Sequence, residues 1–172
     1  MTKSVKELNK KTKDIKIFCD ITRCIGCKSC EIACAIEHSQ SKNIFSAVKL
    51  KYLPKKRVKT EKVKEGIISL HCQHCKEAPC VTTCMSGALT KDEKTGQTLH
   101  NDEKCVGCWM CVMVCPFGAL TRDTQKQIAV KCDLCPDRED YACVAACPTG
   151  ALFAGTKKEF EKLVKERSEK KK

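Results

Sequence analysis

Short apolar runs, each broken by glycine or by polar turn residues, are the dominant pattern of this chain. Gly-Ala-Leu occurs three times, at residues 87–89, 118–120 and 150–152. Each glycine permits a backbone turn that other residues adopt with difficulty, and the apolar pair after it is typical of a strand that enters a core. We therefore predict a repeated unit of loop, short helix and strand.

Two hairpins are predicted from turn signals and from alternation. Residues 94–96, Lys-Thr-Gly, mark one hairpin turn. Apolar residues alternate with polar ones from Val48 to Tyr52, ahead of Pro54, which predicts a second hairpin within residues 49–65.

Both chain ends are rich in lysine. Thr156 and Glu159 match a capping box ahead of apolar residues at helical spacing, so a basic C-terminal helix is predicted within residues 156–172. Residues 1–16 are expected to form a mobile basic arm.

The composition leaves little material for an ordinary hydrophobic core. Leu, Ile, Val and Phe together make up about a fifth of the 172 residues, close to the level below which chains fail to fold on apolar burial alone. Seventeen residues are cysteines. Disulfides or bound metal must therefore supply much of the stability.

Disulfides fit the sequence poorly. The number of cysteines is odd, and the Lys-rich start of the chain contains no apolar signal segment for secretion. The longest apolar stretches are too short to cross a bilayer. We expect a cytoplasmic protein without direct membrane insertion, whose thiols stay reduced or bind metal.

Sixteen of the cysteines form four runs, and only Cys19 stands apart. The spacing is C-x2-C-x2-C-x3-C in the first and third runs, C-x2-C-x4-C-x3-C in the second and C-x2-C-x7-C-x3-C in the fourth. The runs are Cys24, Cys27, Cys30 and Cys34; Cys72, Cys75, Cys80 and Cys84; Cys105, Cys108, Cys111 and Cys115; and Cys132, Cys135, Cys143 and Cys147.

These spacings favour iron-sulfur clusters over zinc. Zinc sites usually combine two C-x2-C pairs from distant segments, whereas here a fourth cysteine follows the third after three residues in every run. In the [4Fe-4S] pattern three neighbouring thiolates bind one cubane, and the fourth, expected to start a helix, reaches the next cluster. Cys-Pro at 115–116 and 147–148 matches the end of that pattern. The sequence predicts four [4Fe-4S] clusters.

The lengths of the linkers indicate which runs share a module. Twenty residues separate Cys84 from Cys105, but 37 separate Cys34 from Cys72. We therefore favour nesting, the second run with the third and the first with the fourth, over a sequential pairing that keeps every ligand and changes only the partners. With the fourth cysteine of each run crossing to the neighbouring cluster, the nested ligand sets are Cys24/Cys27/Cys30/Cys147 (the Cys147 set), Cys34/Cys132/Cys135/Cys143 (the Cys34 set), Cys72/Cys75/Cys80/Cys115 (the Cys115 set) and Cys84/Cys105/Cys108/Cys111 (the Cys84 set).

The predicted fold is α+β. It consists of two ferredoxin-like modules, each holding two [4Fe-4S] clusters and nested in sequence. Residues 17–66 plus 122–155 form the outer module, and residues 67–121 form the inner one.

The motifs of the chain resemble those of a known family. Over about residues 17–155 the four runs look like the four-cluster electron-transfer subunits of the dimethyl sulfoxide reductase group. Three stretches, residues 33–39, 105–118 and 131–138, resemble more narrowly the iron-sulfur subunit of carbon monoxide dehydrogenase.

This resemblance implies a non-catalytic subunit. It would accept electrons from the nickel-iron-sulfur enzyme that oxidises CO and pass them to a hydrogenase, a ferredoxin or a flavin oxidoreductase. The same role in a formate dehydrogenase or hydrogenase complex is the alternative, and a metal-binding or nucleic-acid module without redox function is a third. Because the sequence shows neither a nucleotide-binding glycine loop nor a nucleophile-base arrangement, the clusters would carry the chemistry.

The formal net charge is +12 at pH 7, and the excess lies in residues 1–17, 49–65 and 156–172. Four clusters with their thiolates would contribute about −8, so much of the excess is compensation. The basic stretches form a solvated face, dock an acidic redox partner or contact nucleic acid. Aromatic residues make up only 5% of the chain, and no nucleic-acid partner is expected.

Four other residues lie beside the runs. Cys19 is predicted to be a buried strand thiol rather than a ligand. His71 and His74 flank Cys72, and they either pack as ordinary side chains or tune a cluster through charge or a hydrogen bond. Trp109, between two ligands, is expected to keep water from its cluster.

Overall fold

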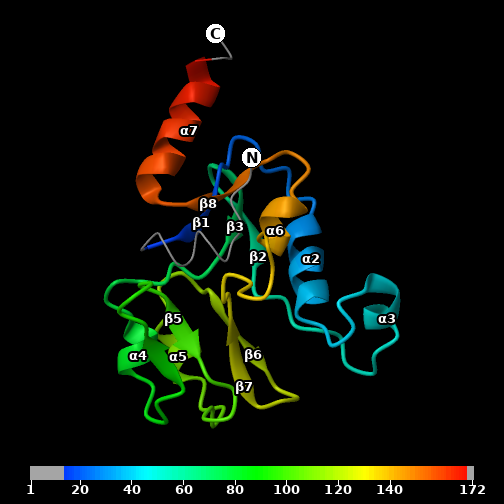
Figure 1. Ribbon diagram of the computed structural model, residues 1–172, viewed down its shortest axis with the longest axis vertical. Coiled ribbons are helices and arrows are strands. Elements are labelled where there is room, and N and C mark those ends of the chain that lie inside the picture. The colour runs from blue at the N-terminus through cyan, green and yellow to red at the C-terminus, as the bar shows by residue number, and fades with distance from the viewer. Residues whose placement is uncertain (1–13, 170–172) are drawn as a thin grey trace.

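Within residues 14–169, which the computed structural model describes, four pairs of antiparallel strands connect the cysteine runs (Figure 1). The strands are β1 (Lys16–Cys19), β2 (Lys59–Val63), β3 (Gly66–Leu70), β4 (Leu89–Lys91), β5 (Thr98–His100), β6 (Leu120–Asp123), β7 (Ile128–Lys131) and β8 (Leu152–Gly155). The helices are α2 (Ser29–Glu37), α3 (Ile44–Val48), α4 (Pro79–Thr82), α5 (Met110–Met113), α6 (Ala142–Ala145) and α7 (Lys157–Glu169). The architecture therefore mixes helices with short antiparallel strands.

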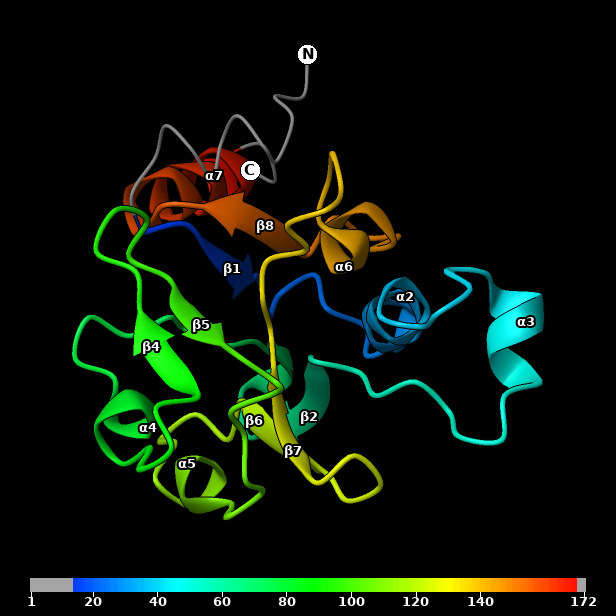
Figure 2. The same ribbon diagram turned by 60° about the horizontal axis from the view of Figure 1, so that its bottom comes forward.

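Segments far apart in the sequence meet in this fold. Strand β1 pairs with β8, with Cys19 opposite Leu152. Helix α2 contacts α6, and α4 contacts α5. Figure 2 shows these two helix pairs in separate parts of the molecule. The first cysteine run therefore lies beside the fourth, and the second lies beside the third.

The repeat predicted from Gly-Ala-Leu is confirmed. Helices α4, α5 and α6 are each about one turn long, and each is followed by a glycine turn and then by β4, β6 or β8. The turn residues Gly87, Gly118 and Gly150 have φ of +65°, +57° and +60°. A Cβ atom disfavours this region of backbone space, so glycine is the residue that the turn requires.

The expectation that the fourth cysteine of a run starts a helix is wrong. Cys80 and Cys111 lie inside the short helices, whereas the fourth cysteines Cys84 and Cys115 follow the helix ends. In the first run, Cys34 lies within the longer α2. Because residues four apart share one face of a helical turn, this arrangement brings the third and fourth thiols of a run close enough to serve neighbouring sites.

Of the two predicted hairpins, the one around residues 94–96 is confirmed as β4–β5. The other is misplaced, because residues 49–58 form no strand and the hairpin is β2–β3, within residues 59–70. The side chain of Asn43 caps α3 by accepting the N–H of Phe45 at 2.9 Å. Pro54 has no N–H to contribute to a strand ladder. The apolar alternation from Val48 to Tyr52 therefore falls on the end of α3 and the loop after it, not on a strand.

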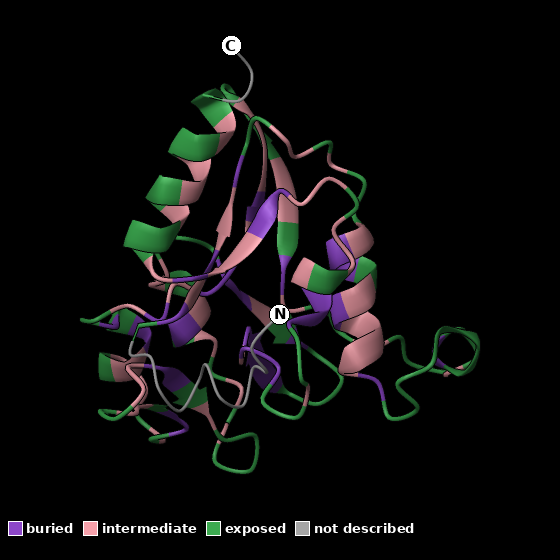
Figure 3. Ribbon diagram, turned by 45° about the horizontal axis from the view of Figure 1, so that its top comes forward, coloured by how far each residue is buried: buried purple, intermediate pink, exposed green. Residues whose placement is uncertain are grey.

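The predicted C-terminal helix is confirmed as α7, which packs on the β1–β8 pair. The N–H of Thr156 donates to Glu159 Oε2 at 2.8 Å, and the N–H of Glu159 donates to Thr156 Oγ1 at 3.4 Å, which completes the capping box. Phe160 stacks on Phe18 of β1, with 5.0 Å between ring centroids. Figure 3 shows the exposed outer side of α7 and its half-buried inner side.

Most of the predicted basic arm, residues 1–16, lies outside the described residues. Ile15 is buried and Lys16 opens β1, so the last residues of that stretch belong to the folded part. Residues 170–172 also lie outside the described part of the chain.

Cysteines make up a large part of the buried core. One cluster of buried side chains contains Leu134 together with Cys30 and Cys132, and a second contains Cys80 and Cys111. In the part of the chain that the structure describes, no helix combines the length and apolar character needed to cross a membrane.

Candidate metal centres

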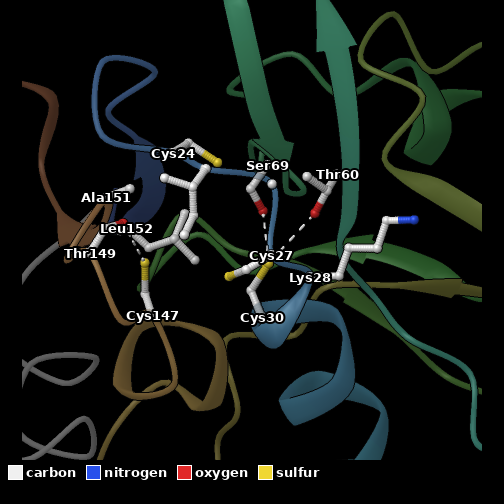
Figure 4. Close-up of a pocket in the computed structure, with 12 residues that line it drawn as sticks. Cys24, Cys27, Lys28, Cys30, Thr60, Ser69, Cys147, Thr149, Ala151 and Leu152 are labelled. Atoms are coloured by element: carbon white, nitrogen blue, oxygen red, sulfur yellow. Dashed lines mark hydrogen bonds between the residues drawn. The ribbon is translucent and has the colours of Figure 1, made fainter.

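Four cysteines from opposite ends of the chain line one pocket (Figure 4). Cys24, Cys27 and Cys30 come from the loop before α2 and from its first turn, and Cys147 follows α6. These are the members of the Cys147 set. They meet because β1 pairs with β8 and α2 contacts α6.

Hydroxyl groups surround the sulfur atoms of this pocket. Thr60 Oγ1 and Ser69 Oγ, both from the β2–β3 hairpin, lie 3.6 and 3.5 Å from Cys30 Sγ. Two further contacts are Ser29 Oγ to Cys27 Sγ at 3.4 Å and Thr149 Oγ1 to Cys147 Sγ at 3.7 Å.

Hydrogen bonds lower the pKa of two thiols in this set. The Ser29 hydroxyl lowers the pKa of Cys27. At Cys147 burial raises the pKa, but hydrogen bonds from the backbone of Leu152 and the hydroxyl of Thr149 outweigh it, so the pKa is lowered. A lowered pKa favours the thiolate, which is the form that binds iron.

A second pocket holds the Cys84 set and is lined by Cys84, Cys105, Cys108 and Cys111. The N–H groups of Leu89 and Ala129 donate to Cys84 Sγ at 3.4 Å and to Cys105 Sγ at 3.5 Å. Ser86 Oγ lies 3.6 Å from Cys84 Sγ. This pocket therefore presents mainly backbone donors to sulfur.

The thiols of the Cys34 set influence one another. Burial raises the pKa of Cys143, and the charges of Cys132, Cys34 and Cys135, with that of Cys30 from the Cys147 set, raise it further. The N–H of Arg57 donates to Cys34 Sγ at 3.2 Å.

The Cys115 set shows the same behaviour. Burial raises the pKa of Cys80, and the charges of Cys72, Cys115 and Cys75 act in the same direction. The N–H of Ala119 donates to Cys115 Sγ at 3.4 Å. The Cys147 and Cys84 sets thus each line one pocket, and the other two sets, like the assignment of clusters to all four, stay predictions.

The chemistry of these groups fits iron-sulfur clusters. Burial raises the pKa of Cys111 and of Cys135 to about 11. A buried thiolate is unstable unless positive charge compensates it, and iron supplies that charge. Backbone N–H groups directed at sulfur are also the contacts that support a bound cluster.

A network of charged side chains joins the end of α2 to the fourth run. His38 Nε2 lies 3.1 Å from Asp133 Oδ1, and Arg57 pairs with the other oxygen of that carboxylate. Burial lowers the pKa of His38, but its hydrogen bond to Asp133 raises it to about 9. Arg138 Nη1 lies 2.7 Å from Glu37 Oε2. Two of the three stretches that carry the narrower resemblance therefore contact each other.

The other candidates beside the runs take different positions. Cys19 ends β1 half-buried, its Sγ accepts the N–H of Ser69 at 3.4 Å, and burial raises its pKa to about 12. His71 and His74 are buried, which lowers their pKa values to about 4 and about 3, so both rings are neutral at pH 7. Trp109 lines the Cys84 pocket.

Nothing in the sequence marks Thr60 or Ser69 as part of a site. They lie 30 and 39 residues from Cys30, on a hairpin that packs over the pocket. The alternation of side chains along a strand could have predicted which residues lie on the same face of the hairpin as Thr60 and Ser69. It could not have predicted that this face contacts Cys30.

A family model described as a 4Fe-4S dicluster domain matches residues 63–157, more than half of the chain. The chain belongs to this 4Fe-4S dicluster family. The matched part of the dicluster protein contains the second, third and fourth cysteine runs.

Three relatives of this dicluster protein extend the match. An iron-sulfur protein of Rhodospirillum rubrum is 35% identical over 134 residues, covering 72% of this chain and 70% of the relative. The electron transport protein HydN of Escherichia coli (strain K12) is 34% identical over 139 residues, covering 72% and 77%. The thiosulfate reductase electron transfer subunit PhsB of Salmonella typhi is 33% identical over 130 residues, covering 76% and 67%. The protein is therefore a member of an iron-sulfur electron-transfer family.

Proposed function

We propose that this protein is a non-catalytic electron-transfer subunit that carries four [4Fe-4S] clusters. The observation that supports the proposal is that the Cys147 and Cys84 sets each line one pocket, while N–H or hydroxyl groups are directed at sulfur atoms in all four predicted sets. The Cys147, Cys34, Cys115 and Cys84 sets would hold one cluster each.

In this proposal the clusters belong to two nested modules. Residues 17–66 plus 122–155 would hold the Cys147 and Cys34 sets, and residues 67–121 would hold the other two. The contacts of α2 with α6 and of α4 with α5 support this arrangement.

Bound clusters supply one-electron chemistry, and the residues around them control where electrons can go. Cys30, Cys72 and Cys132 share one buried apolar cluster, which keeps water out of the space between sets of both modules. Donors at sulfur stabilise added negative charge and help to set each potential. The contribution of the chain is to bind the clusters, insulate them and tune them.

The electron donor that we propose is carbon monoxide dehydrogenase, with a hydrogenase, a ferredoxin or a flavin oxidoreductase as acceptor. The proposal starts from the resemblance of residues 33–39, 105–118 and 131–138. Contacts between Glu37 and Arg138 and between His38 and Asp133 support it, because they join two of these stretches into one feature beside the Cys34 set.

A formate dehydrogenase or hydrogenase complex is the second candidate. The similarity to PhsB supports this second candidate, because PhsB is an electron transfer subunit of thiosulfate reductase, an oxidoreductase other than carbon monoxide dehydrogenase. The four-cluster core would be the same, and only the donor would change.

Anaerobic affinity purification from the native cell, followed by mass spectrometry of the co-eluting subunits, tests the donor. We expect a nickel carbon monoxide dehydrogenase to co-elute and CO to reduce the clusters, as seen by electron paramagnetic resonance (EPR). A molybdenum or tungsten formate dehydrogenase, or a hydrogenase, without that enzyme would move the function to the second candidate.

Iron content and dithionite reduction of the same sample test electron transfer itself. A preparation without iron, or without an EPR signal after reduction, would overturn the proposal whichever partner co-elutes. The Cys19→Ser variant serves as a control and is expected to keep the full iron content.

A further inference from the structure

Helix α3 and the loop that follows it expose apolar side chains to solvent. Phe45 is 78% exposed and Leu53 is 66% exposed. The other exposed large apolar residues of this segment are Ile44, Val48 and Tyr52. Single exposed apolar residues are ordinary, but a group of this size on one short segment marks an interaction surface. We call residues 44–55 the α3 face.

The charge around the α3 face has a single sign. Residues 42–59 contain seven Lys and Arg residues and no Asp or Glu. Lys42 and Lys56 pair with carboxylates of α2, and Arg57 pairs with Asp133. In the described residues no ion pair involves Lys49, Lys51 or Lys55, the three exposed lysines of the face.

The face is held in place at both ends. Asn43 caps α3, and the Ser39 hydroxyl accepts the N–H of Lys42 at 3.0 Å. At the other end the N–H of Arg57 donates to Cys34 Sγ at 3.2 Å. Figures 1 and 2 both show α3 standing away from the other helices, with no element packed on its outer side. The segment therefore projects from the protein but is fixed at both ends, and its second end contacts Cys34, a proposed cluster ligand.

A cleft of about 830 Å³ lies beside the face, and Lys51, Leu53 and Lys126 contribute to its lining. The acidic residues of the cleft are engaged within the protein. Asp133 pairs with His38 and Arg57, Asp102 pairs with His100, and Asp123 accepts the N–H groups of Gln125 and Lys126. Five Lys and Arg residues line the cleft against three Asp residues, so the net charge of its lining is positive.

We propose that the α3 face docks the electron-exchange partner, through a patch of that partner that is apolar at its centre and rimmed by Asp and Glu. The inference rests on the proposed electron-transfer function. On this proposal, electrons pass between the partner and the Cys34 set, because the N–H of Arg57, just after the α3 face, contacts Cys34 of that set. Apolar contact would supply the stability of the complex, and the lysines would supply orientation and rate of encounter.

Zero-length carbodiimide cross-linking of the anaerobically purified native complex tests the proposal, because this reagent joins lysine amines to carboxylates in contact. We expect Lys49, Lys51 or Lys55 to be linked to Asp or Glu residues of the co-purifying redox subunit. Links confined to α7, to the β2–β3 hairpin or to residues 105–118 would overturn the docking surface. The identity of the linked subunit is read separately, so the proposed donor can fail while the surface stands.

Two paired variants sharpen the result. Phe45→Ser/Leu53→Ser should lower recovery of the redox subunit about tenfold, and Lys51→Glu/Lys55→Glu should lower it most at low salt. The matched control is Lys158→Glu/Lys165→Glu, which reverses two exposed lysines on α7 that make no ion pair in the described residues. Every variant should keep its iron content and EPR signal. Full recovery of the subunit with both α3-face variants, or RNA in place of a protein partner, would overturn the proposal.

Discussion

The Cys147 and Cys84 pockets share a ligand pattern but differ in what surrounds it. Each takes three cysteines from a C-x2-C-x2-C sequence and a fourth from another run. The hydroxyl groups that contact sulfur in the Cys147 pocket come from Ser29, Thr60, Ser69 and Thr149. The contacts in the Cys84 pocket come from the backbone of Leu89 and Ala129 and from the hydroxyl of Ser86.

This difference teaches that the same ligand spacing does not imply the same redox potential. An added electron places negative charge on the sulfur atoms, and each hydroxyl that donates to sulfur stabilises that charge. We therefore expect a cluster in the Cys147 pocket to be reduced at a higher potential than one in the Cys84 pocket.

Loss of a ligand should have the largest effect. If the proposed sets hold four clusters, Cys24→Ser and Cys147→Ser should each cost about a quarter of the iron, and the double variant should lose no more, because the proposal assigns both ligands to one cluster. Cys24→Ser combined with Cys108→Ser should lose about twice as much, since it affects both pockets. Iron per protein chain and the EPR spectrum measure this, and additive losses for the Cys24/Cys147 pair would contradict the Cys147 set.

A glycine substitution should distinguish the packing of the two pockets. Gly26 and Gly107 hold equivalent places in their runs, with φ of +69° and +66°. A Cβ on Gly26 would lie 2.8 Å from the flexible Cδ1 of Ile67, but on Gly107 it would lie 2.5 Å from the backbone oxygen of Gln127. Gly26→Ala should lower the free energy of unfolding by about 1–2 kcal/mol, and Gly107→Ala should lower it by more.

Anaerobic thermal unfolding of the cluster-loaded protein measures these changes. The matched control is Gly118→Ala, where φ is +57° and no atom lies within 4 Å of the added Cβ, so that only backbone strain contributes. Equal destabilisation by Gly107→Ala and Gly118→Ala would show that the contact with Gln127 is unimportant.

Removal of two hydroxyls should produce a smaller change, confined to one cluster. The Thr60→Val/Ser69→Ala variant removes both hydroxyls from Cys30 Sγ, so the midpoint potential of that cluster should fall by roughly 20–60 mV. A redox titration followed by EPR detects the shift, with Ser168→Ala on α7 as the control. An unchanged set of potentials would mean that these hydroxyls do not donate to sulfur.

The smallest effect is expected from Ser86→Ala. It removes one hydroxyl contact from the Cys84 pocket and leaves its backbone donors intact, so its shift should be roughly half that of the Thr60/Ser69 variant and should affect a different cluster. The same titration compares the two. A larger shift for Ser86→Ala would reverse the proposed contrast between the pockets.

Predictions from the sequence succeeded where the controlling contacts are local. The Thr156–Glu159 capping box joins residues three apart, and Gly-Ala-Leu describes a turn completed within a few residues. The hairpin prediction failed at residues 49–58, where apolar alternation occurs in a loop, because alternation alone does not supply a partner strand.

The sequence by itself determined which residues are candidate ligands and which metal group suits them, because the spacing of thiols along a short covalent segment limits the geometry that they can reach. It also indicated, from linker lengths, which runs would lie together. Only the tertiary structure decided which hydroxyls contact Cys30 and which basic segment projects beside Cys34. Those contacts join residues far apart in the chain, and they depend on how the β2–β3 hairpin and the loop after α3 pack in space.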